Sequence, residues 1–256
     1  MKVTIITATY NSENCIQRAI DSVANQDYKN IEHIIIDGGS TDGTLSIIKS
    51  NLNKIATYIS EKDNGIYSAF NTGLKLATGD IIGFLNSDDT YNDPHVISRT
   101  VNSFTIKKCD VLYGNLVYQS RNSEKSRTIR YWKSNVFHPN CLKYGWMPPH
   151  PTVYFKKEIY EKYGYFDENF RISADYDFIL RVFKDTTVRK TYLPIVMVKM
   201  DVGGVSNGSF KGICRKSRED FEAIRRNNIG GFYTLFCKNF RKVMQFSKFR
   251  ISKYSC

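Results

Sequence analysis

Short apolar runs alternate with amphipathic stretches through the first hundred residues, and this alternation restricts the fold more than any other feature. The runs carry few charges, so strands made from them need cover on both faces. The stretches between them have apolar residues at helical spacing, as at Ile16, Ala19, Ile20 and Val23. The expected strands are residues 3–7, 31–36, 55–59 and 81–85, and the expected helices are residues 16–23, 45–48, 66–77 and 96–104. The pattern predicts an α/β fold with a mostly parallel, Rossmann-like sheet flanked by helices.

Polar and acidic segments follow all four expected strands. They are Thr7–Asn11, Asp37–Gly43, Glu61–Gly65 and Asn86–Asp89. Each segment alone is ordinary turn chemistry, because Asn, Asp and Gly suit turns. Right-handed crossovers, however, place the carboxyl ends of parallel strands along one edge, where open α/β sheets bind ligands. The sequence therefore predicts a binding site at this edge.

The acidic pair Asp88 and Asp89 directly follows the fourth expected strand. Two carboxylates alone would repel an anionic nucleotide, whereas a hard divalent cation can bind carboxylate and phosphate oxygens together. Mg²⁺ and Mn²⁺ both suit such oxygen ligands. The sequence has neither a G-x-G-x-x-G nor a G-x-x-x-x-G-K-[ST] motif, which excludes the usual dinucleotide and P-loop sites.

Positive charge is concentrated at the end of the chain. Of a formal net charge of +12, residues 211–256 contribute twelve basic and three acidic side chains. Apolar residues in this segment repeat at helical spacing, at Tyr233, Phe236, Phe240, Val243 and Met244. A basic, aromatic, amphipathic helix is typical of binding to an anionic membrane surface. The alternative is a helix that packs its apolar stripe on the domain and leaves its lysines in solvent.

Several other classes of protein are disfavoured. No window approaches the roughly 20 apolar residues of a transmembrane helix, and the start of the chain lacks a signal-peptide pattern. The six cysteines form no C-x-x-C pair and the four histidines lack metal-ligand spacing, so a zinc site is not expected. We expect a cytoplasmic chain that is peripheral on the inner face of the cell membrane.

Three motifs together resemble glycosyltransferase family 2. They are Asp37-Gly-Gly-Ser-Thr-Asp-Gly-Thr44, Asp63-Asn-Gly-Ile-Tyr-Ser-Ala-Phe-Asn71 and Gly79-Asp-Ile-Ile-Gly-Phe-Leu-Asn-Ser-Asp-Asp89, and the resemblance covers about residues 1–205. It implies the GT-A fold, a nucleotide-sugar donor, Mg²⁺ or Mn²⁺, and inversion at the anomeric carbon. Two positions depart from many relatives: Gly38 replaces a second aspartate, and Phe70 replaces an arginine.

The resemblance also implies site residues in the first half. Asp88 stands at the metal-binding D-x-D position, and Asn86 is expected to face the ribose or the sugar. The donor-binding residues that it implies are Thr7, Ala8, Thr9, Tyr10, Asn11, Asp37, Gly38, Asp63, Asn64, Asn71, Asn86, Ser87 and Asp88. Asp89 is expected either to add a second metal-binding charge or to cap the next helix.

The second half contributes a candidate base at Asp175. Inverting transfer needs a carboxylate that takes the acceptor's proton, and the resemblance places that carboxylate here. The alternative is an acid at a helix N-terminus, favoured by the helix dipole; Asp177 is interpreted as a structural acid. Trp146 and His150 lie in a proline-stiffened loop. They are candidates for acceptor contact, or else parts of a rigid connector with a buried Trp.

The chain is accordingly predicted to divide into a GT-A domain, residues 1–210, and a basic amphipathic helical tail, residues 211–256. Within the domain, residues 1–105 would bind the nucleotide sugar and residues 106–210 the acceptor. The expected reaction is hexosyl or N-acetylhexosaminyl transfer from a UDP-sugar to a saccharide or lipid-linked saccharide in surface polysaccharide or glycan synthesis.

Two alternatives remain open at this point. The first is a nucleic-acid-binding protein whose tail stacks on bases, which the acidic sheet edge disfavours because it would repel phosphates. The second is a sugar-nucleotide pyrophosphorylase. It is disfavoured because the sequence has no glycine- and lysine-rich phosphate loop near its N-terminus.

Overall fold

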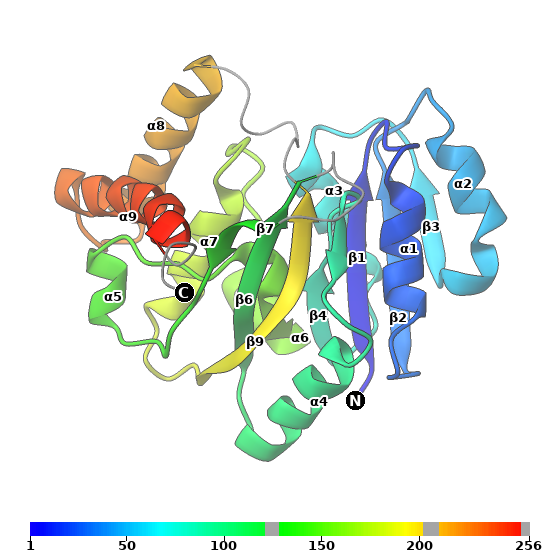
Figure 1. The fold of residues 1–256 in the computed structure, drawn as a ribbon, viewed down its shortest axis with the longest axis horizontal. Helices are drawn as coiled ribbons and strands as arrows, with labels where there is room; N and C mark the ends of the chain where they lie inside the picture. Colours follow the sequence, from blue (N-terminus) through cyan, green and yellow to red (C-terminus); the bar gives the residue numbers. More distant parts are fainter. Residues whose placement is uncertain (121–127, 202–209, 252–256) are drawn as a thin grey trace.

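A mixed β-sheet runs through the centre of the computed structural model, which describes residues 1–120, 128–201 and 210–251 (Figure 1). The strands are β1 (Val3–Thr9), β2 (Ile31–Asp37), β3 (Thr57–Ser60), β4 (Ile81–Phe84), β5 (Asp89–Tyr91), β6 (Val111–Gln119), β7 (Thr128–Trp132), β8 (Tyr154–Lys156) and β9 (Lys190–Asp201). Their order is β3-β2-β1-β4-β8-β6-β9-β5, with β7 paired to β6. The longest pairings, β1–β2 and β6–β9, are parallel, whereas β8 is antiparallel to both of its neighbours.

Helices cover both faces of the sheet, as the alternation of the sequence predicts. On one face lie α1 (Ile16–Ala24), α2 (Thr44–Ser50) and α4 (Val96–Lys107), and on the other α3 (Ile66–Leu76), α6 (Lys157–Tyr163) and α7 (Ala174–Phe183). Successive residues of a strand point to opposite faces. Ile5 therefore joins the apolar cluster that contains Val96 of α4, while Ile6 joins the cluster that contains Phe70 of α3.

The first half contains all of the predicted elements, with their ends shifted by up to three residues. The third strand begins at Thr57 instead of residue 55, because the 3₁₀ turn Leu52–Lys54 ends at Ile55. Asp89 neither caps a helix nor lies in a loop. It begins β5, is opposite Met200 of β9 and is fully buried.

The remaining helices are α5 (Asn140–Lys143), α8 (Phe210–Arg226) and α9 (Phe232–Ile251), with a second 3₁₀ turn at His150–Thr152. Figure 1 shows α8 and α9 beyond α7 and β7, at the end of the sheet opposite β3. Ala223 and Ile224 of α8 belong to the main apolar cluster, so α8 packs on the sheet domain. Across the residues that the structure describes, no helix is both long enough and apolar enough to cross a bilayer. Val243 and Met244 of α9 lie outside the side chains described.

Candidate active site

The loops that follow β1, β2 and β4 meet at one edge of the sheet because β1 lies between the other two strands. Thr9 is opposite Asp37 in the parallel β1–β2 register. The loops after β1 and β4 touch through the hydroxyl oxygens of Ser12 and Ser87, which are 3.0 Å apart. The structure thus gathers the polar strand ends that the sequence assigns to the donor.

Asp37 is buried at this edge and accepts hydrogen bonds from the loop that follows β2 and from the end of β3. Its Oδ2 accepts the Ser40 backbone N–H at 3.1 Å and the Ser60 hydroxyl at 2.6 Å, and its Oδ1 accepts the Ser40 hydroxyl. Gly38 follows, and a Cβ placed there would lie 2.9 Å from Oδ2 of Asp63. The missing side chain at Gly38 therefore lets the Asp63 carboxylate come up against the backbone beside Asp37.

The segment after β1 is half inside the protein and half in solvent. Thr7, Ala8 and Thr9 are buried, and the Thr9 hydroxyl has no hydrogen-bond partner among the described residues. Tyr10 and Asn11 are exposed. The Asn11 side-chain oxygen accepts the backbone N–H of Thr41 at 2.9 Å, which ties this segment to the loop after β2. An unsatisfied buried hydroxyl at a strand end is a group that a ligand could satisfy.

Asp88 and Asp89 differ sharply although they are adjacent. Asp88 is partly exposed, whereas Asp89 is buried and its Oδ2 accepts the side-chain N–H of Asn86 at 2.8 Å. Burial, reinforced by the negative charges of Asp88 and Asp201, raises the pKa of Asp89 well above its usual range. Asp89 Oδ1 has no hydrogen-bond partner within the described part of the chain.

Asp88 and Asp89 suit a divalent cation that is bound partly by the protein and partly by the substrate. The described ranges contain no group of three or more His, Cys, Asp or Glu side chains arranged to hold an ion. Mg²⁺ is commonly bound by one or two carboxylates together with substrate phosphates and water. The partly exposed Asp88, next in sequence to a buried Asp89 whose Oδ1 has no partner among the described residues, matches this shared mode of binding.

Asp175 lies in the first turn of α7 and is partly exposed. The Tyr67 hydroxyl is 3.0 Å from Asp175 Oδ1 and 2.7 Å from the carbonyl oxygen of Ile172. Burial, together with the charge of Asp175, raises the pKa of Tyr67 well above its usual value. Tyr67 therefore keeps its proton and acts as a hydrogen-bond donor toward the carboxylate and the carbonyl.

Asp177 has a different environment from Asp175, as its interpretation as a structural acid requires. It is buried, and its carboxylate accepts hydrogen bonds from Arg181 at 2.6 Å and from Asn227 at 2.8 Å. Both of its oxygens thus have partners within the fold. Of the two acids in this turn, only Asp175 is partly exposed.

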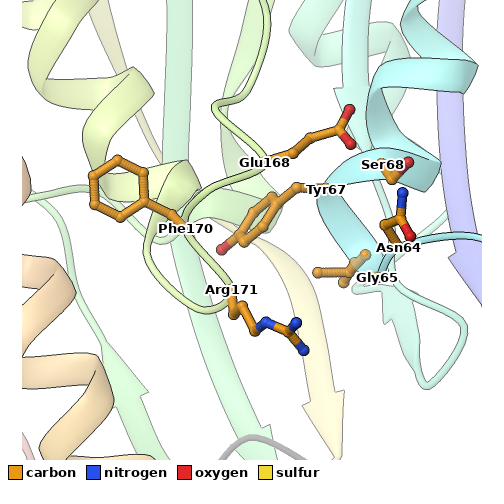
Figure 2. A pocket seen from close by; sticks show the side chains of 8 residues that line it. Asn64, Gly65, Tyr67, Ser68, Glu168, Phe170 and Arg171 are labelled. Atoms are coloured by element: carbon orange, nitrogen blue, oxygen red, sulfur yellow. The ribbon is translucent and has the colours of Figure 1, made fainter.

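A pocket of about 170 Å³ lies beside the Tyr67–Asp175 pair. Figure 2 shows Tyr67 in its wall, between the start of α3 and the loop before α7. Its lining residues are Asn64, Gly65, Ile66, Tyr67, Ser68, Glu168, Phe170 and Arg171. Sequence reasoning included only Asn64 of this set. The signal for the others was their position, since Tyr67 lies inside a motif and Arg171 lies four residues before Asp175.

Comparison with known proteins identifies the family. The model of Glycosyl transferase family 2 matches residues 4–172. The chain belongs to this family. It is also 31% identical to an uncharacterized glycosyltransferase of Mycobacterium tuberculosis over 210 residues, which are 80% of this chain and 77% of the relative.

Two solved structures show the same fold as this family 2 chain. One is S. aureus TarS 1–349 in complex with UDP-GlcNAc, with a TM-score of 0.66 and 20% identity over 89% of this chain and 65% of that one. The other is a mannosyltransferase from Pyrobaculum calidifontis in complex with GDP-Man and Mn²⁺, with a TM-score of 0.66 and 20% identity over 93% of this chain and 68% of that one. The chain is thus a glycosyltransferase with a GT-A-like α/β fold.

Two residues implied by the family motifs have other surroundings here. Asn71 is buried. Its side chain exchanges hydrogen bonds with the backbone of Phe166, at 2.9 and 3.0 Å, and donates to Glu168 Oε1 at 2.8 Å. It therefore pins the segment before α7 to α3, and both polar atoms of its side chain have partners within the fold. Phe70, where many relatives have arginine, packs against Phe84 with ring centroids 4.5 Å apart.

The predicted acceptor residues of this family 2 chain are also buried. Trp146 is 6% exposed and packs against Tyr113, Phe137 and Phe183. His150 stacks on Phe84, and burial lowers its pKa. This arrangement disfavours sugar stacking, because aromatic neighbours pack against both rings. It matches the alternative of a rigid connector with a buried Trp.

Proposed function

We propose that the chain is an inverting, metal-dependent glycosyltransferase that uses a UDP-sugar. It moves a hexosyl or N-acetylhexosaminyl group to a saccharide or lipid-linked saccharide in surface polysaccharide or glycan synthesis. The observation that carries the proposal is the 3.0 Å contact between Tyr67 and Asp175. It joins a motif of the donor half to a partly exposed carboxylate of the second half, and Tyr67 itself lines a pocket.

The donor is assigned to the sheet edge. Residues proposed to line its site are Thr7, Ala8, Thr9, Tyr10, Asn11, Asp37, Gly38, Asp63, Asn64, Asn86, Ser87 and Asp88, and Asn71 is left out because of its buried bonds. Two structures of similar fold hold UDP-GlcNAc and GDP-Man, which supports a nucleotide sugar as the donor. Asp88 would bind Mn²⁺ or Mg²⁺, which supplies positive charge where the diphosphate leaves.

Transfer then needs a base, and Asp175 is assigned that role. Its carboxylate takes the proton of the acceptor hydroxyl while the oxygen attacks the anomeric carbon. The bond from that carbon to the diphosphate oxygen breaks on the opposite face, and the leaving nucleoside diphosphate keeps the electron pair. Attack from the far side inverts the anomeric centre. The Tyr67 hydroxyl orients the carboxylate by bonding to its Oδ1.

Calorimetric titration with UDP, GDP and dTDP, each with and without Mn²⁺, tests the donor site. We expect UDP to bind tightly, and binding to collapse without the metal and in Asp88→Ala. Asp80→Ala is the matched control, because Asp80 immediately precedes β4 at the end opposite Asp88 and accepts the backbone N–H of Lys2 at 2.7 Å. Metal-independent binding, or unchanged binding by Asp88→Ala, would contradict the metal assignment.

We also propose that α9 holds the enzyme at the anionic inner surface of the cell membrane. The edge of the helix that faces the domain includes Thr234, the largely buried side chain of Lys238, and Leu235, which packs against the main apolar cluster. Its aromatic edge faces outward: Phe232, Tyr233, Phe236 and Phe240 are 77, 65, 66 and 54% exposed. This is the reverse of the alternative in which the aromatic stripe packs on the domain. Exposed aromatics in a strongly basic segment suit an anionic bilayer.

Flotation with phosphatidylcholine vesicles, with and without phosphatidylglycerol, tests this surface. We expect binding only to the anionic vesicles, and a loss of about tenfold or more in the double variant Phe236→Ser/Phe240→Ser, since each removes a large apolar group. Ile106→Ser on α4 is the control, because Ile106 is equally exposed but lies on another helix. Salt-dependent binding to DNA or RNA, without vesicle binding, would favour the nucleic-acid alternative.

A further inference from the structure

Three charged side chains of the C-terminal helices lie behind residues 172–176, the segment that leads into α7 and contains Asp175. They are Glu219 and Asp220 of α8 and Lys238 of α9, and the Asp220 side chain is 1% exposed. Charged residues are rarely buried unless they are paired, so such a cluster has a specific set of partners. Those partners lie on both sides of Asp175.

Glu219 holds the backbone before α7. Its Oε2 accepts the N–H groups of Ile172 at 2.8 Å and of Ser173 at 3.0 Å. The carbonyl oxygen of Ile172 accepts the Tyr67 hydroxyl at 2.7 Å, and the same hydroxyl reaches Asp175. Residue 172 is therefore clamped from two sides, by α8 at its N–H and by α3 at its carbonyl.

Asp220 and Lys238 extend the same support. Ser173, the N-cap residue of α7, donates its hydroxyl to Asp220 Oδ1 at 2.7 Å. Lys238 Nζ lies 2.6 Å from the same oxygen and 3.3 Å from the ring centroid of Tyr176. The nearby lysines hold the pKa of Asp220 below its usual range in spite of burial. The cluster thus contacts Ser173 before Asp175 and Tyr176 directly after it.

The position of α9 depends on this contact and on one close approach. A Cβ at Gly145, whose φ is +67°, would lie 2.5 Å from the backbone nitrogen of Lys238. Arg241 donates to the carbonyl oxygen of Tyr144 at 2.9 Å. The helix therefore contacts the domain through the edge that carries Lys238 and Leu235, and Lys238 lies against Asp220 and Tyr176 beside Asp175.

We propose that Glu219, Asp220 and Lys238 are positioning residues for the transfer reaction. They fix the backbone from Ile172 to Tyr176 so that Asp175 meets the acceptor hydroxyl at a constant angle. The C-terminal helices are then part of the active site and not a separable tail after residue 210. The inference rests on the proposed role of Asp175 as the base.

The test compares Glu219→Ala, Glu219→Gln and Ser173→Ala with wild type and with Asp175→Asn. Nucleoside diphosphate release from UDP-, GDP- and dTDP-sugars, with water as acceptor, first identifies the working donor. For Glu219→Ala we expect kcat to fall about 10- to 100-fold, since a displacement of about 1 Å at a reacting group can cost 10² in rate. KM for the donor and calorimetric nucleotide affinity should stay within about twofold, because the donor edge is untouched.

Glu219→Gln should restore much of the rate, because its amide oxygen can still accept the two N–H groups. Glu222→Ala is the control on the same helix, as Glu222 is exposed. If Glu219→Ala does not fold, Glu219→Gln and Ser173→Ala carry the test, each with a smaller fall in kcat at constant KM. Wild-type kcat in all the variants, or equal losses in kcat and nucleotide affinity, would overturn the inference. A fully active Asp175→Asn would instead overturn the proposed function.

Discussion

Asp37 and Asp175 are both assigned to the reaction, yet the chain holds them in different ways. Asp37 accepts from Ser40, three residues on, and from Ser60 of the neighbouring strand. Asp175 is reached by Tyr67, 108 residues away, and its loop is held by Glu219, 47 residues from Ile172. The donor edge is thus built within the first third of the chain. The segment from Ile172 to Asp175 depends instead on Tyr67 from the first third of the chain and on Glu219 from near its end.

Replacing the base gives the largest expected effect and separates the two regions most clearly. Asp175→Asn should lower kcat by about 10²–10⁴, the usual contribution of a general base. Nucleotide affinity should be unchanged, because Asp37 and Asp88 remain in place. Turnover within about tenfold of wild type would show that another group takes the proton. Asp177→Asn is not a suitable control, since Asp177 is buried in its own hydrogen bonds.

Tyr67→Phe removes the contact that links the two regions. Hydrogen bonds to charged groups contribute about 1.5–3 kcal/mol, so we expect kcat to fall about 10- to 100-fold. Tyr165→Phe is the control, because Tyr165 is an exposed tyrosine close to the same loop. The measurement is single-turnover rate together with nucleotide affinity. A loss of nucleotide affinity with an unchanged rate would mean that Tyr67 contributes to donor binding and not to positioning Asp175.

Acid should lower the free energy of unfolding through a buried histidine of the donor half. Burial lowers the pKa of His33 on β2 from 6.5 to about 4. Between these values the unfolded chain binds more protons than the folded one, so the free energy of unfolding decreases as the pH falls. From pH 7 to pH 5 this residue alone should remove about 2 kcal/mol, at 1.36 kcal/mol per pKa unit of difference.

Urea unfolding at pH 7 and pH 5 measures the effect, with His33→Gln as the comparison. The variant has no ionisable group at this position, so its stability should change less with pH. Asp220 should keep its charge over the same range, because its pKa lies below the usual value. An equal pH dependence in wild type and variant would contradict the assignment to His33.

The smallest effect is expected at Asp37. Asp37→Asn retains one acceptor oxygen for Ser40 and Ser60 but removes the negative charge, and we expect nucleotide affinity to fall about fivefold, close to 1 kcal/mol for one hydrogen bond. The turnover rate at saturating donor should not change, since the base loop is held from elsewhere. A fall in kcat at saturation would mean that the two regions are coupled more tightly than their contacts indicate.

The strands and helices of the donor half could be predicted well because the pattern of each one lies within its own sequence. Ile5, Ile6, Ile34 and Ile35 are buried strand residues, and their apolar runs alone indicate strands covered on both faces. The three-residue strand β5 was missed because it begins with an acid and pairs with Met200, far along the chain. No local pattern marks such a strand. The same is true of Asn71, which is buried and whose partners are Phe166 and Glu168, far along the chain.

The sequence by itself determined the family resemblance, the polar edge of the sheet, and Asp88 and Asp175 as candidates, because motifs and periodicity are local properties of the chain. Only the tertiary structure decided that Trp146 is covered, that Asp89 is buried and that Glu219 clamps the loop of the base. It also decided which edge of α9 faces the domain. Periodicity predicts two faces for a helix, but the partner of each face depends on what lies beside it after folding. Here Asp220 pairs with Lys238, and Gly145 leaves room for the backbone of Lys238. The edge with Lys238 therefore faces the domain, and the aromatic edge stays in solvent.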